Sequence, residues 1–428
     1  MSRSKTWNET EALQLVRDCV AKELPPTTPM PGDEEDLAQE ELVDSMGWVG
    51  ILSGIEERTG IRNFGNPWPP GRPQSIHALA EILREAKVTA AVPSPDRSSN
   101  VGAETSCEVS IQGWGYALGS VTLSGEEVEQ EIGLDPGTLV RGAGIESVRR
   151  AAEDETEVTL AVRAAGAAAE SASLVLDEVD VLVSTSTTFL QLPGLAATLH
   201  SRLLLRENAA ALDVGGACVG LIHALSVARG LLQSGQRALA LVVASEVHSR
   251  RLASPGVPAE MRGLFGDGAC AFLLRREEEG AEGGAFRVGD FVGGCAGTFA
   301  SAVRASLQDN LGIVVQFQGE QIGQAAVTHL DRVFTSLERL TGKSRNEADC
   351  FALHEPNPRL VEILAQKAGI APAKIPQISR TCGNLGAATC GVSLCQALTD
   401  LSKRSARAPL IFLAAVAPGL LWAGTVIR

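Results

Sequence analysis

The chain has 428 residues, of which 45% are hydrophobic and 21% are charged. This composition is typical of a soluble globular protein, and the length is sufficient for two or three domains. The formal net charge is −14, and no stripe of lysine and arginine is interleaved with aromatic residues. We therefore expect no nucleic-acid partner.

The first residues, MSRSKTWNETEA, have no apolar run behind their charges, so they do not form a secretory signal. We therefore expect a cytoplasmic protein. The longest apolar stretch, PLIFLAAVAPGLLWAG, is interrupted by Pro418 and Gly419 and is too short to span a bilayer. It predicts two buried strands around a turn and no membrane association.

Nine cysteines are spread along the chain without a CxxC pair, and the six histidines lie among them without metal-ligand spacing. A disulfide framework and a zinc site are therefore not expected, and we predict no bound metal. Most of the thiols are expected to be small core residues.

Two changes in composition divide the sequence. Residues 88–106, VTAAVPSPDRSSNVGAETS, are small and polar, contain two prolines and show no hydrophobic period, which predicts a flexible linker. Residues 1–87 are then one domain. Residues 107–428 are another, with halves at about 107–285 and 286–428.

The small domain contains several helical patterns. The first follows Asn8 and Thr10, which are possible caps, the second begins just after Asp44 and Ser45, and the third covers residues 76–83. These patterns predict a small all-α bundle. Nine acidic residues and no basic residue occur between positions 33 and 57, so one flank of the bundle is expected to be strongly negative.

In the large domain, apolar runs alternate with helical patterns, which predicts α/β architecture. The first set is VDVLVSTST, a helix over 195–206, AALDV, a helix from Cys218 and ALALVVAS. The second set is IVVQFQ, a helix over 322–340, CFALHE, a helix over 358–368, a helix from Asn384 and LIFLAAV.

The two sets repeat one unit, in which a glycine turn, a helix of small residues and a buried strand follow one another. DVGGACVGLIHALSVARGLL with ALALVVAS parallels RTCGNLGAATCGVSLCQALTDL with PLIFLAAV, so a duplicated half is the economical explanation. Cys218 and Asn384 then occupy similar places, each at the start of a helix directed into the middle of the domain.

Cys218 is a candidate nucleophile. A thiol at a helix N-terminus is near unpaired N–H groups, which lower its pKa and favour the thiolate, although a small core cysteine is the alternative. His354 ends a predicted buried strand, and Asn384 lies in the matching glycine turn. Three such residues at corresponding positions predict one shared pocket.

Residues 107–428 resemble the β-ketoacyl-acyl-carrier-protein synthase III family, which has the duplicated, thiolase-like α/β/α/β/α fold. The resemblance rests on GACVG around Cys218, HEPN at His354, GNLGAAT at Asn384, FGDGACAFLL, RGAGIESVRRAAEDE and LLWAGTVIR. It implies an acyltransferase that is a homodimer. Cys218 would take an acyl group from a thioester, while His354 and Asn384 would donate hydrogen bonds to a malonyl-type thioester as it loses CO2.

Several positions depart from the family pattern. Thr138 and Gly142 stand where the family commonly has a tryptophan and an arginine that clamp coenzyme A, so an acyl carrier is an alternative donor. Pro418 stands where a loop glycine supplies an oxyanion-hole N–H, which proline lacks, and Gly419 is the candidate replacement. Leu192 stands where the partner subunit's phenylalanine often lines the acyl pocket.

In the small domain, LVDSMGWVGILSGIEERTGI resembles helix II of an acyl carrier protein, which is a four-helix bundle. The resemblance implies 4'-phosphopantetheine on Ser45, attached by a phosphopantetheinyl transferase. It also implies that the acidic flank docks on basic patches of partner enzymes. The alternatives are that Ser45 is only a helix N-cap and that the acidic face is only solvated.

The combined interpretation is an acyl carrier domain fused to a ketosynthase III-like domain, with roles for acyl and malonyl thioesters in specialised polyketide or fatty-acyl synthesis. A tethered carrier raises the local concentration of one chosen substrate. Two alternatives remain. One is acyl transfer or carrier-to-carrier coupling on the same scaffold without decarboxylation, and the other is a non-catalytic scaffold that docks carriers.

Overall fold

The computed structural model describes residues 7–25, 28–40, 42–43, 45–61, 64, 68, 72–86, 107–277, 286–297, 303–308, 312–317, 319–403 and 408–428. These residues divide into two compact units. The smaller is drawn from Met1–Ala103 with Phe317–His329, and the larger from Glu104–Gln316 with Leu330–Arg428. The predicted linker, residues 88–106, lies outside the described residues.

The N-terminal part of the small unit is helical. Its described residues contain α1 (Glu9–Glu23), α2 (Ser45–Thr59) and α3 (Ile76–Glu85). The fourth helix that the carrier resemblance implies is not among them, and the described residues 28–40, which hold Pro29, Pro31 and Gly32, form turns. The two later helices begin at the predicted residues.

Local capping explains where α1 and α3 begin. The Asn8 side chain accepts a hydrogen bond from the N–H of Glu11 at 2.9 Å, and the Glu11 carboxylate accepts one from the N–H of Asn8, so the predicted Asn8 cap is confirmed. Ser75 caps α3 through the N–H of Ala78 at 3.2 Å. The apolar faces of the three helices share one core, in which Trp48 is buried.

The acidic run of this unit is partly used inside it. Asp33 accepts two hydrogen bonds from Arg17, at 2.9 and 2.5 Å, and Asp36 accepts backbone N–H groups. The Glu56 side chain is buried and accepts the N–H of Phe64 at 2.9 Å. The negative flank is therefore weaker than the bare sequence predicts.

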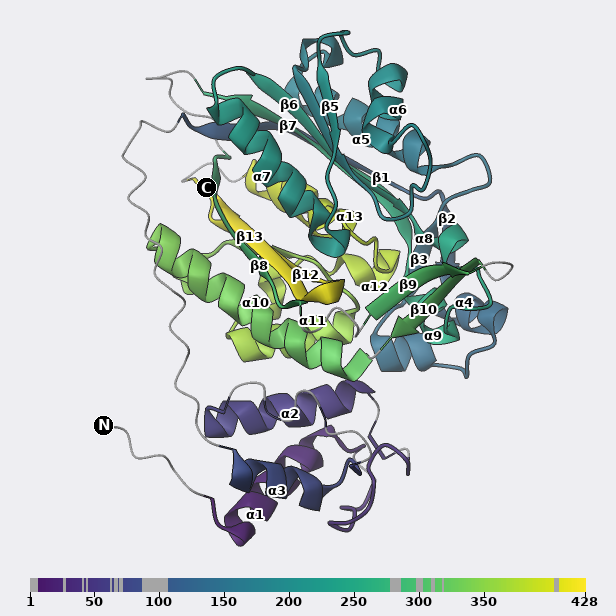
Figure 1. Cartoon of the computed structure of the whole chain (residues 1–428), viewed down its shortest axis with the longest axis vertical. Helices are drawn as coiled ribbons and strands as arrows, with labels where there is room; N and C mark the ends of the chain where they lie inside the picture. Colours follow the sequence, from purple (N-terminus) through teal and green to yellow (C-terminus); the bar gives the residue numbers. More distant parts are fainter. Residues whose placement is uncertain are drawn as a thin grey trace. The chain divides into compact units, whose positions relative to one another are not determined.

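The large unit contains two main sheets (Figure 1). In order across the first sheet the strands are β1 (Val109–Leu118), β7 (Asp267–Arg276), β6 (Leu239–Val247), β4 (Val181–Thr185) and β5 (Ala210–Asp213). In order across the second they are β11 (Cys350–Leu353), β12 (Ile411–Ala417), β13 (Leu421–Ile427) and β8 (Val288–Cys295). The parallel strands β4 and β6 are buried along their whole length, as their unbroken apolar runs predict.

Helices α7 (Gly220–Gln233) and α13 (Ala388–Leu401) lie between the two sheets (Figure 1). Their side chains join strands of both sheets in one hydrophobic cluster. Helices α5 (Glu157–Ala172) and α6 (Leu195–Arg202) cover the outer face of the first sheet, and Phe334 of α10 (Gly319–Thr341) packs on Phe351 and Phe412 of the second. The predicted α/β/α/β/α layering of the large domain is confirmed.

One predicted strand has a different place. The run IVVQFQ was expected to open the second half, but β10 (Gly312–Phe317) pairs with β9 (Val303–Gln308) in a separate two-stranded sheet. The second main sheet uses β8 instead. An apolar run predicts that a strand forms, but it does not specify the strand with which it pairs.

The remaining described elements connect these layers. They are β2 (Val121–Ser124), β3 (Ser147–Arg150), α4 (Gly125–Ile132), α8 (His248–Arg251), α9 (Ala259–Leu264), α11 (Pro358–Ala368) and α12 (Ile378–Cys382). No helix in the described residues is both long and apolar enough to cross a membrane.

Candidate active site

Cys218 lies in a tight turn between β5 and α7. The turn passes through Gly216, with φ 146°, and Ala217, with φ 48°, into a short 3₁₀ turn, Ala217–Val219. A Cβ on Gly216 would lie 2.6 Å from Nδ1 of His223, so only glycine fits there. The turn leaves Cys218 half-buried just before α7.

The protonation of Cys218 differs from the sequence prediction. Burial raises the pKa of the Cys218 thiol to about 12, and the charge of Glu246 acts in the same direction. The expected lowering of this pKa by the helix N-terminus was wrong, because desolvation and a nearby carboxylate outweigh the backbone N–H groups. Cys218 therefore rests as a thiol, and a reaction must remove its proton as the new bond forms.

Asn384 lies in the corresponding turn ahead of α13. Its backbone N–H donates to the carbonyl of Leu264 at 2.8 Å, and its carbonyl accepts from the N–H of Gly266 at 3.0 Å. This turn of the second half is therefore fastened to the loop before β7 of the first half. Gly383, with φ 72°, and Gly386, with φ 58°, supply the left-handed backbone on either side.

The orientation of the Asn384 amide follows from its neighbours. Its Oδ1 accepts from the N–H of Gly386 at 2.9 Å and from the hydroxyl of Thr389 at 3.3 Å. A backbone N–H needs an acceptor, so the oxygen of the amide must face Gly386. Nδ2 is then the atom of Asn384 that can donate to a ligand.

His354 follows β11 and is 6% exposed. Its backbone N–H donates to the carbonyl of Ala414 in β12 at 3.0 Å, which fixes its place at the end of the strand. Burial lowers the pKa of His354 to about 4, against a backbone hydrogen bond with Gly386. His354 is therefore neutral near pH 7, and its Nδ1 is buried without a hydrogen-bond partner in the described residues.

The predicted residues are brought into one neighbourhood. The Cys218 turn packs against β12, the strand that binds the backbone of His354. Cys218 is also close enough to Cys390 of α13 that a charge on it raises the pKa of Cys390. His354 interacts with Gly386 in the Asn384 turn. The structure therefore places Cys218, His354 and Asn384 where the two halves of the large unit meet.

Two polar residues of this neighbourhood, Glu246 and His248, were not predicted from the sequence. The Glu246 carboxylate is fully buried and accepts the N–H groups of Thr187 and Thr188 at 3.0 and 3.1 Å. Its charge acts on both Cys218 and His248. They could have been found in the sequence because they are polar residues at the end of the apolar run ALALVVASEVH.

Glu355 is a third buried polar group, directly after His354. Its Oε2 accepts the N–H and the hydroxyl of Ser379, at 3.0 and 3.1 Å, while Oε1 has no partner in the described residues. Burial raises the pKa of Glu355 to about 7, against the hydrogen bonds from Ser379. This carboxyl group joins the His354 segment to α12, which leads into the Asn384 turn.

The remaining predicted positions are Pro418, Gly419, Leu192 and Ser45. Pro418 opens the turn between β12 and β13, where Gly419, with φ 77°, uses its carbonyl to accept from Sγ of Cys295 at 3.5 Å. Leu192, between β4 and α6, is 97% exposed and lines no pocket within one chain. Ser45 is the first residue of α2, in the small unit. No group of three acidic, histidine or cysteine residues suited to a metal occurs in the described part of the chain.

The duplicated fold and the site at the junction of its halves define a ketosynthase III type of condensing enzyme, an acyltransferase on a thiolase-like scaffold. Residues 212–290 match the family model 3-oxoacyl-[acyl-carrier-protein] synthase III, and residues 339–428 match the model of its C-terminal part.

Sequence comparison with named proteins points to the same family. β-Ketoacyl-[acyl-carrier-protein] synthase III of Ruegeria sp. (strain TM1040) is 31% identical over 334 residues, which cover 74% of this chain and 98% of that protein. The enzyme of the same name from Rhodospirillum rubrum is 30% identical over 332 residues, with the same two shares covered. The chain therefore belongs to the β-ketoacyl-[acyl-carrier-protein] synthase III family.

Solved structures show the same fold. The 3-oxoacyl-[acyl-carrier-protein] synthase III of Aquifex aeolicus superposes with a TM-score of 0.67 at 26% identity, covering 75% of this chain and 99% of that one. OleA of Xanthomonas campestris (H285A) also gives a TM-score of 0.67, at 22% identity, covering 75% of this chain and 98% of that one, and it supports the fold alone.

Proposed function

We propose that this protein catalyses a decarboxylative condensation, in which an acyl group on Cys218 is extended by a malonyl-type thioester. The observation that carries the proposal is the orientation of the Asn384 amide. Gly386 and Thr389 occupy its oxygen, so its N–H groups are left to stabilise a negative oxygen. The imidazole of the neutral His354 is the second donor in the same neighbourhood.

The proposed reaction has two steps. In the first, Cys218 attacks an acyl thioester, a new S–C bond forms, and the released thiol takes the proton that Cys218 loses. In the second, the malonyl thioester loses CO2, and the N–H donors of Asn384 and His354 stabilise the enolate oxygen that forms. The enolate carbon attacks the acyl carbonyl, the bond to Cys218 breaks, and its sulfur regains a proton. The product is a β-ketoacyl thioester.

Measuring CO2 tests this proposal. The acylated protein is mixed with a malonyl thioester labelled in its free carboxyl group, and the released CO2 and the acyl state of Cys218 are followed together. Condensation predicts one CO2 for each acyl group lost from the protein. Acyl loss to an acceptor without CO2 would overturn condensation, and failure of Cys218 to accept any acyl thioester would support the non-catalytic scaffold.

A second candidate, acyl transfer without decarboxylation, is favoured by one observation. Pro418 has no N–H and stands in the turn between β12 and β13, where the resemblance predicts an oxyanion-hole donor. Gly419 is the adjacent residue with an N–H. A hydroxyl, an amine or a second carrier would be the acceptor, and the absence of CO2 in the experiment above would identify this reaction.

We also propose that the small unit is an acyl carrier whose prosthetic group, 4'-phosphopantetheine, is attached to Ser45. Its three described helices share one core, and α2 begins at Ser45, as the resemblance to carrier helix II predicts. A tethered carrier would raise the local concentration of one thioester, which suits specialised polyketide or fatty-acyl synthesis. Residues 88–106 would be the flexible linker between the carrier domain (1–87) and the ketosynthase domain (107–428).

Intact-protein mass spectrometry tests the carrier proposal. Co-expression with a phosphopantetheinyl transferase should add one prosthetic group, and Ser45→Ala should prevent the addition. Ser53→Ala, which changes a buried serine of the same helix, is the matched control and should still be modified. An unchanged mass of the wild-type protein would remove the carrier proposal.

We propose, finally, that the enzyme is a homodimer. Strand β5 is at the edge of the first sheet, and its Leu212 is 39% exposed. The nearby loop exposes Leu190 and Leu192, at 55% and 97%, which is unusual for large apolar side chains on a monomer. A second copy that covers this edge would bring Leu192 to the partner's acyl pocket. Light scattering should show a dimer, and Leu192→Asp should alter the preferred acyl length.

A further inference from the structure

His248 is a buried histidine that the proposed reaction does not use. It opens α8, directly after β6, and is 7% exposed. Its Nδ1 is buried without a hydrogen-bond partner in the described residues. An unpaired buried polar atom costs about 1–3 kcal/mol, and a leucine or phenylalanine would fill a similar volume without this cost. The ring forms a polar interaction with the backbone of Gly266, which also bonds the carbonyl of Asn384, so the imidazole is tied to the Asn384 turn.

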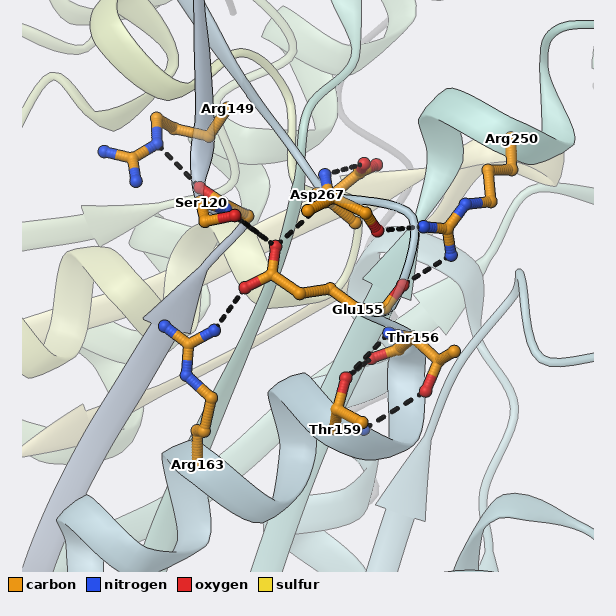
Figure 2. Close-up of polar contacts among 11 residues, drawn as sticks. Ser120, Arg149, Glu155, Thr156, Thr159, Arg163, Arg250 and Asp267 are labelled. Carbon is orange, nitrogen blue, oxygen red and sulfur yellow. Dashed lines mark hydrogen bonds and ion pairs between the residues drawn. The ribbon is translucent and has the colours of Figure 1, made fainter.

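The residues that follow His248 are held in place by a polar network (Figure 2). The N–H and the hydroxyl of Ser249 donate to the buried Asp267 at 2.9 and 2.5 Å. Arg250 donates to the backbone carbonyls of Glu155 and Ala152. These contacts fix the backbone of α8, so the His248 ring has a defined place.

The acid at the centre of that network is itself fully engaged. The Glu155 carboxylate accepts the N–H groups of Ser120 and Ala152, at 2.8 and 2.9 Å, and pairs with Arg163 (Figure 2). Although burial acts in the opposite direction, these hydrogen bonds lower the pKa of Glu155 to about 2. Glu155 is therefore charged near pH 7, and its carboxylate holds the backbone of Ser120 and Ala152 in place.

The His248 ring fills the space between two segments that hold Asn384. On one side it packs against the ring of Phe265, with centroids 4.6 Å apart and planes inclined by 33°. On the other side it lies against Gly386, where an added Cβ would come within 2.5 Å of its Cε1. Phe265 lies between the two residues that bond the backbone of Asn384, and Gly386 bonds its side chain.

The same ring is electrostatically coupled to His354. Burial lowers the pKa of both histidines, and a charge on His248 further lowers the pKa of His354. The charge of Glu246 acts on His248 and raises its pKa, but it is not among the groups that affect His354. Both rings are therefore held towards the neutral form, and a charge on His248 would oppose a charge on His354.

We propose that His248 is a positioning residue for the condensation step, which acts by wedging the Asn384 turn and by facing His354. This inference rests on the proposed decarboxylative function. His248 is not required to touch the substrate. It keeps the amide of Asn384 and the imidazole of His354 in the arrangement in which both donate to the enolate oxygen.

The test compares two half-reactions in His248→Phe, which keeps an aromatic ring against Phe265 but removes both nitrogens. Acylation of Cys218, followed by intact-protein mass spectrometry, should stay within about twofold of wild type, whereas CO2 release should fall about 10- to 100-fold, the order expected for misplaced catalytic groups. The fall should appear in kcat and not in KM. His200→Phe, on the outer helix α6, is the matched control and should leave both half-reactions unchanged.

A second arm tests the wedge itself by combining Gly386→Ala with His248→Ala. With His248 present, the new methyl group meets the imidazole. In the His248→Ala background the imidazole is gone, so Gly386→Ala should reduce CO2 release and the melting midpoint by less in the double variant. Part of the reduction should persist, because φ 58° is strained for alanine. If Gly386→Ala reduces CO2 release and the melting midpoint equally in both backgrounds, the proposed packing of His248 against Gly386 has no role.

The outcomes separate this inference from the proposed function. If wild type becomes acylated but never releases CO2, the condensation function fails, and the positioning role fails with it. If wild type releases CO2 and His248→Phe does so equally fast, only the positioning role fails. A parallel loss of acylation, CO2 release and melting midpoint would show that His248 is structural and would also overturn the proposal.

Discussion

The two glycine turns of the large unit occupy equivalent places, yet they are built differently. The Cys218 turn packs against β12 of the other half, but its hydrogen bonds stay within its own half, such as the bond between Nδ1 of His223 and the carbonyl of Gly215 at 3.1 Å, and Cys218 is half-buried. The Asn384 turn is bonded across to the other half through Leu264 and Gly266, and Asn384 is only 5% exposed.

The difference matches the roles proposed for the two turns. A nucleophile has to form and break a covalent bond, so its thiol needs access to a substrate. An oxyanion donor has to keep one orientation, so its amide benefits from a buried and fully bonded setting. Duplication of one structural unit thus provides two helix-start turns that serve opposite requirements.

The largest expected effect comes from removing the thiol of Cys218. Cys218→Ala removes the covalent route, so we expect condensation to fall at least about 10³-fold. Intact-protein mass spectrometry after incubation with an acyl thioester should show no acyl adduct. An adduct that persists would assign the nucleophile to one of the other eight cysteines.

The next largest effect should come from Asn384→Asp, which separates the two tasks of the Asn384 turn. Aspartate keeps an oxygen for the N–H of Gly386 but loses the N–H donor. We expect CO2 release to fall about 10²- to 10³-fold, while acylation of Cys218 continues. The melting midpoint should be nearer to wild type than that of Asn384→Ala, which loses the acceptor too. CO2 release at the wild-type rate would show that Asn384 does not stabilise the enolate.

The smallest effect concerns the carboxyl group that joins the segments of His354 and Asn384. The pKa of Glu355 is raised from 4.5 to about 7, so the folded state binds this proton more tightly than the unfolded state does. The resulting stability is fully present below about pH 4.5 and is lost as the pH rises to 7, by up to about 3 kcal/mol.

Denaturant titrations between pH 4.5 and 7.5 check this pH dependence. Glu355→Gln keeps an oxygen for Ser379 and does not titrate. The unfolding free energy of wild type, taken relative to that of Glu355→Gln, should therefore fall as the pH rises. His354 has the opposite effect in both proteins, because its lowered pKa reduces stability as the pH falls from 6.5 to about 4, and it cancels in the difference. A difference that does not vary with pH would show that Glu355 is not protonated in the folded protein.

Much of the fold could be predicted because strong local patterns agree with the tertiary structure. The buried runs that form β4, β6 and β12 and the helix over 358–368 were predicted close to their observed bounds, and Asn8 was recognised as a cap. The pairing of β10 with β9 could not be predicted, since pairing depends on contacts that are distant in sequence.

The candidate site was predicted as far as its motifs extend. Cys218, His354 and Asn384 were found because each follows a recognisable turn or strand end. Their electrostatics were not, because the pKa of Cys218 depends on burial and on Glu246, which belongs to another strand. His248 escaped notice because its significance depends on Gly386, which lies 138 positions further along the chain.

The bridge between Asn384 and the Leu264–Gly266 loop has a consequence for how the protein loses activity. The two backbone amides that hold Asn384, the proposed donor, also join the two halves, so their hydrogen exchange should require the contact between the halves to open. Any fluctuation that separates the two halves would abolish activity while each sheet stays intact. Heat or denaturant should therefore abolish condensation before circular dichroism records a loss of secondary structure.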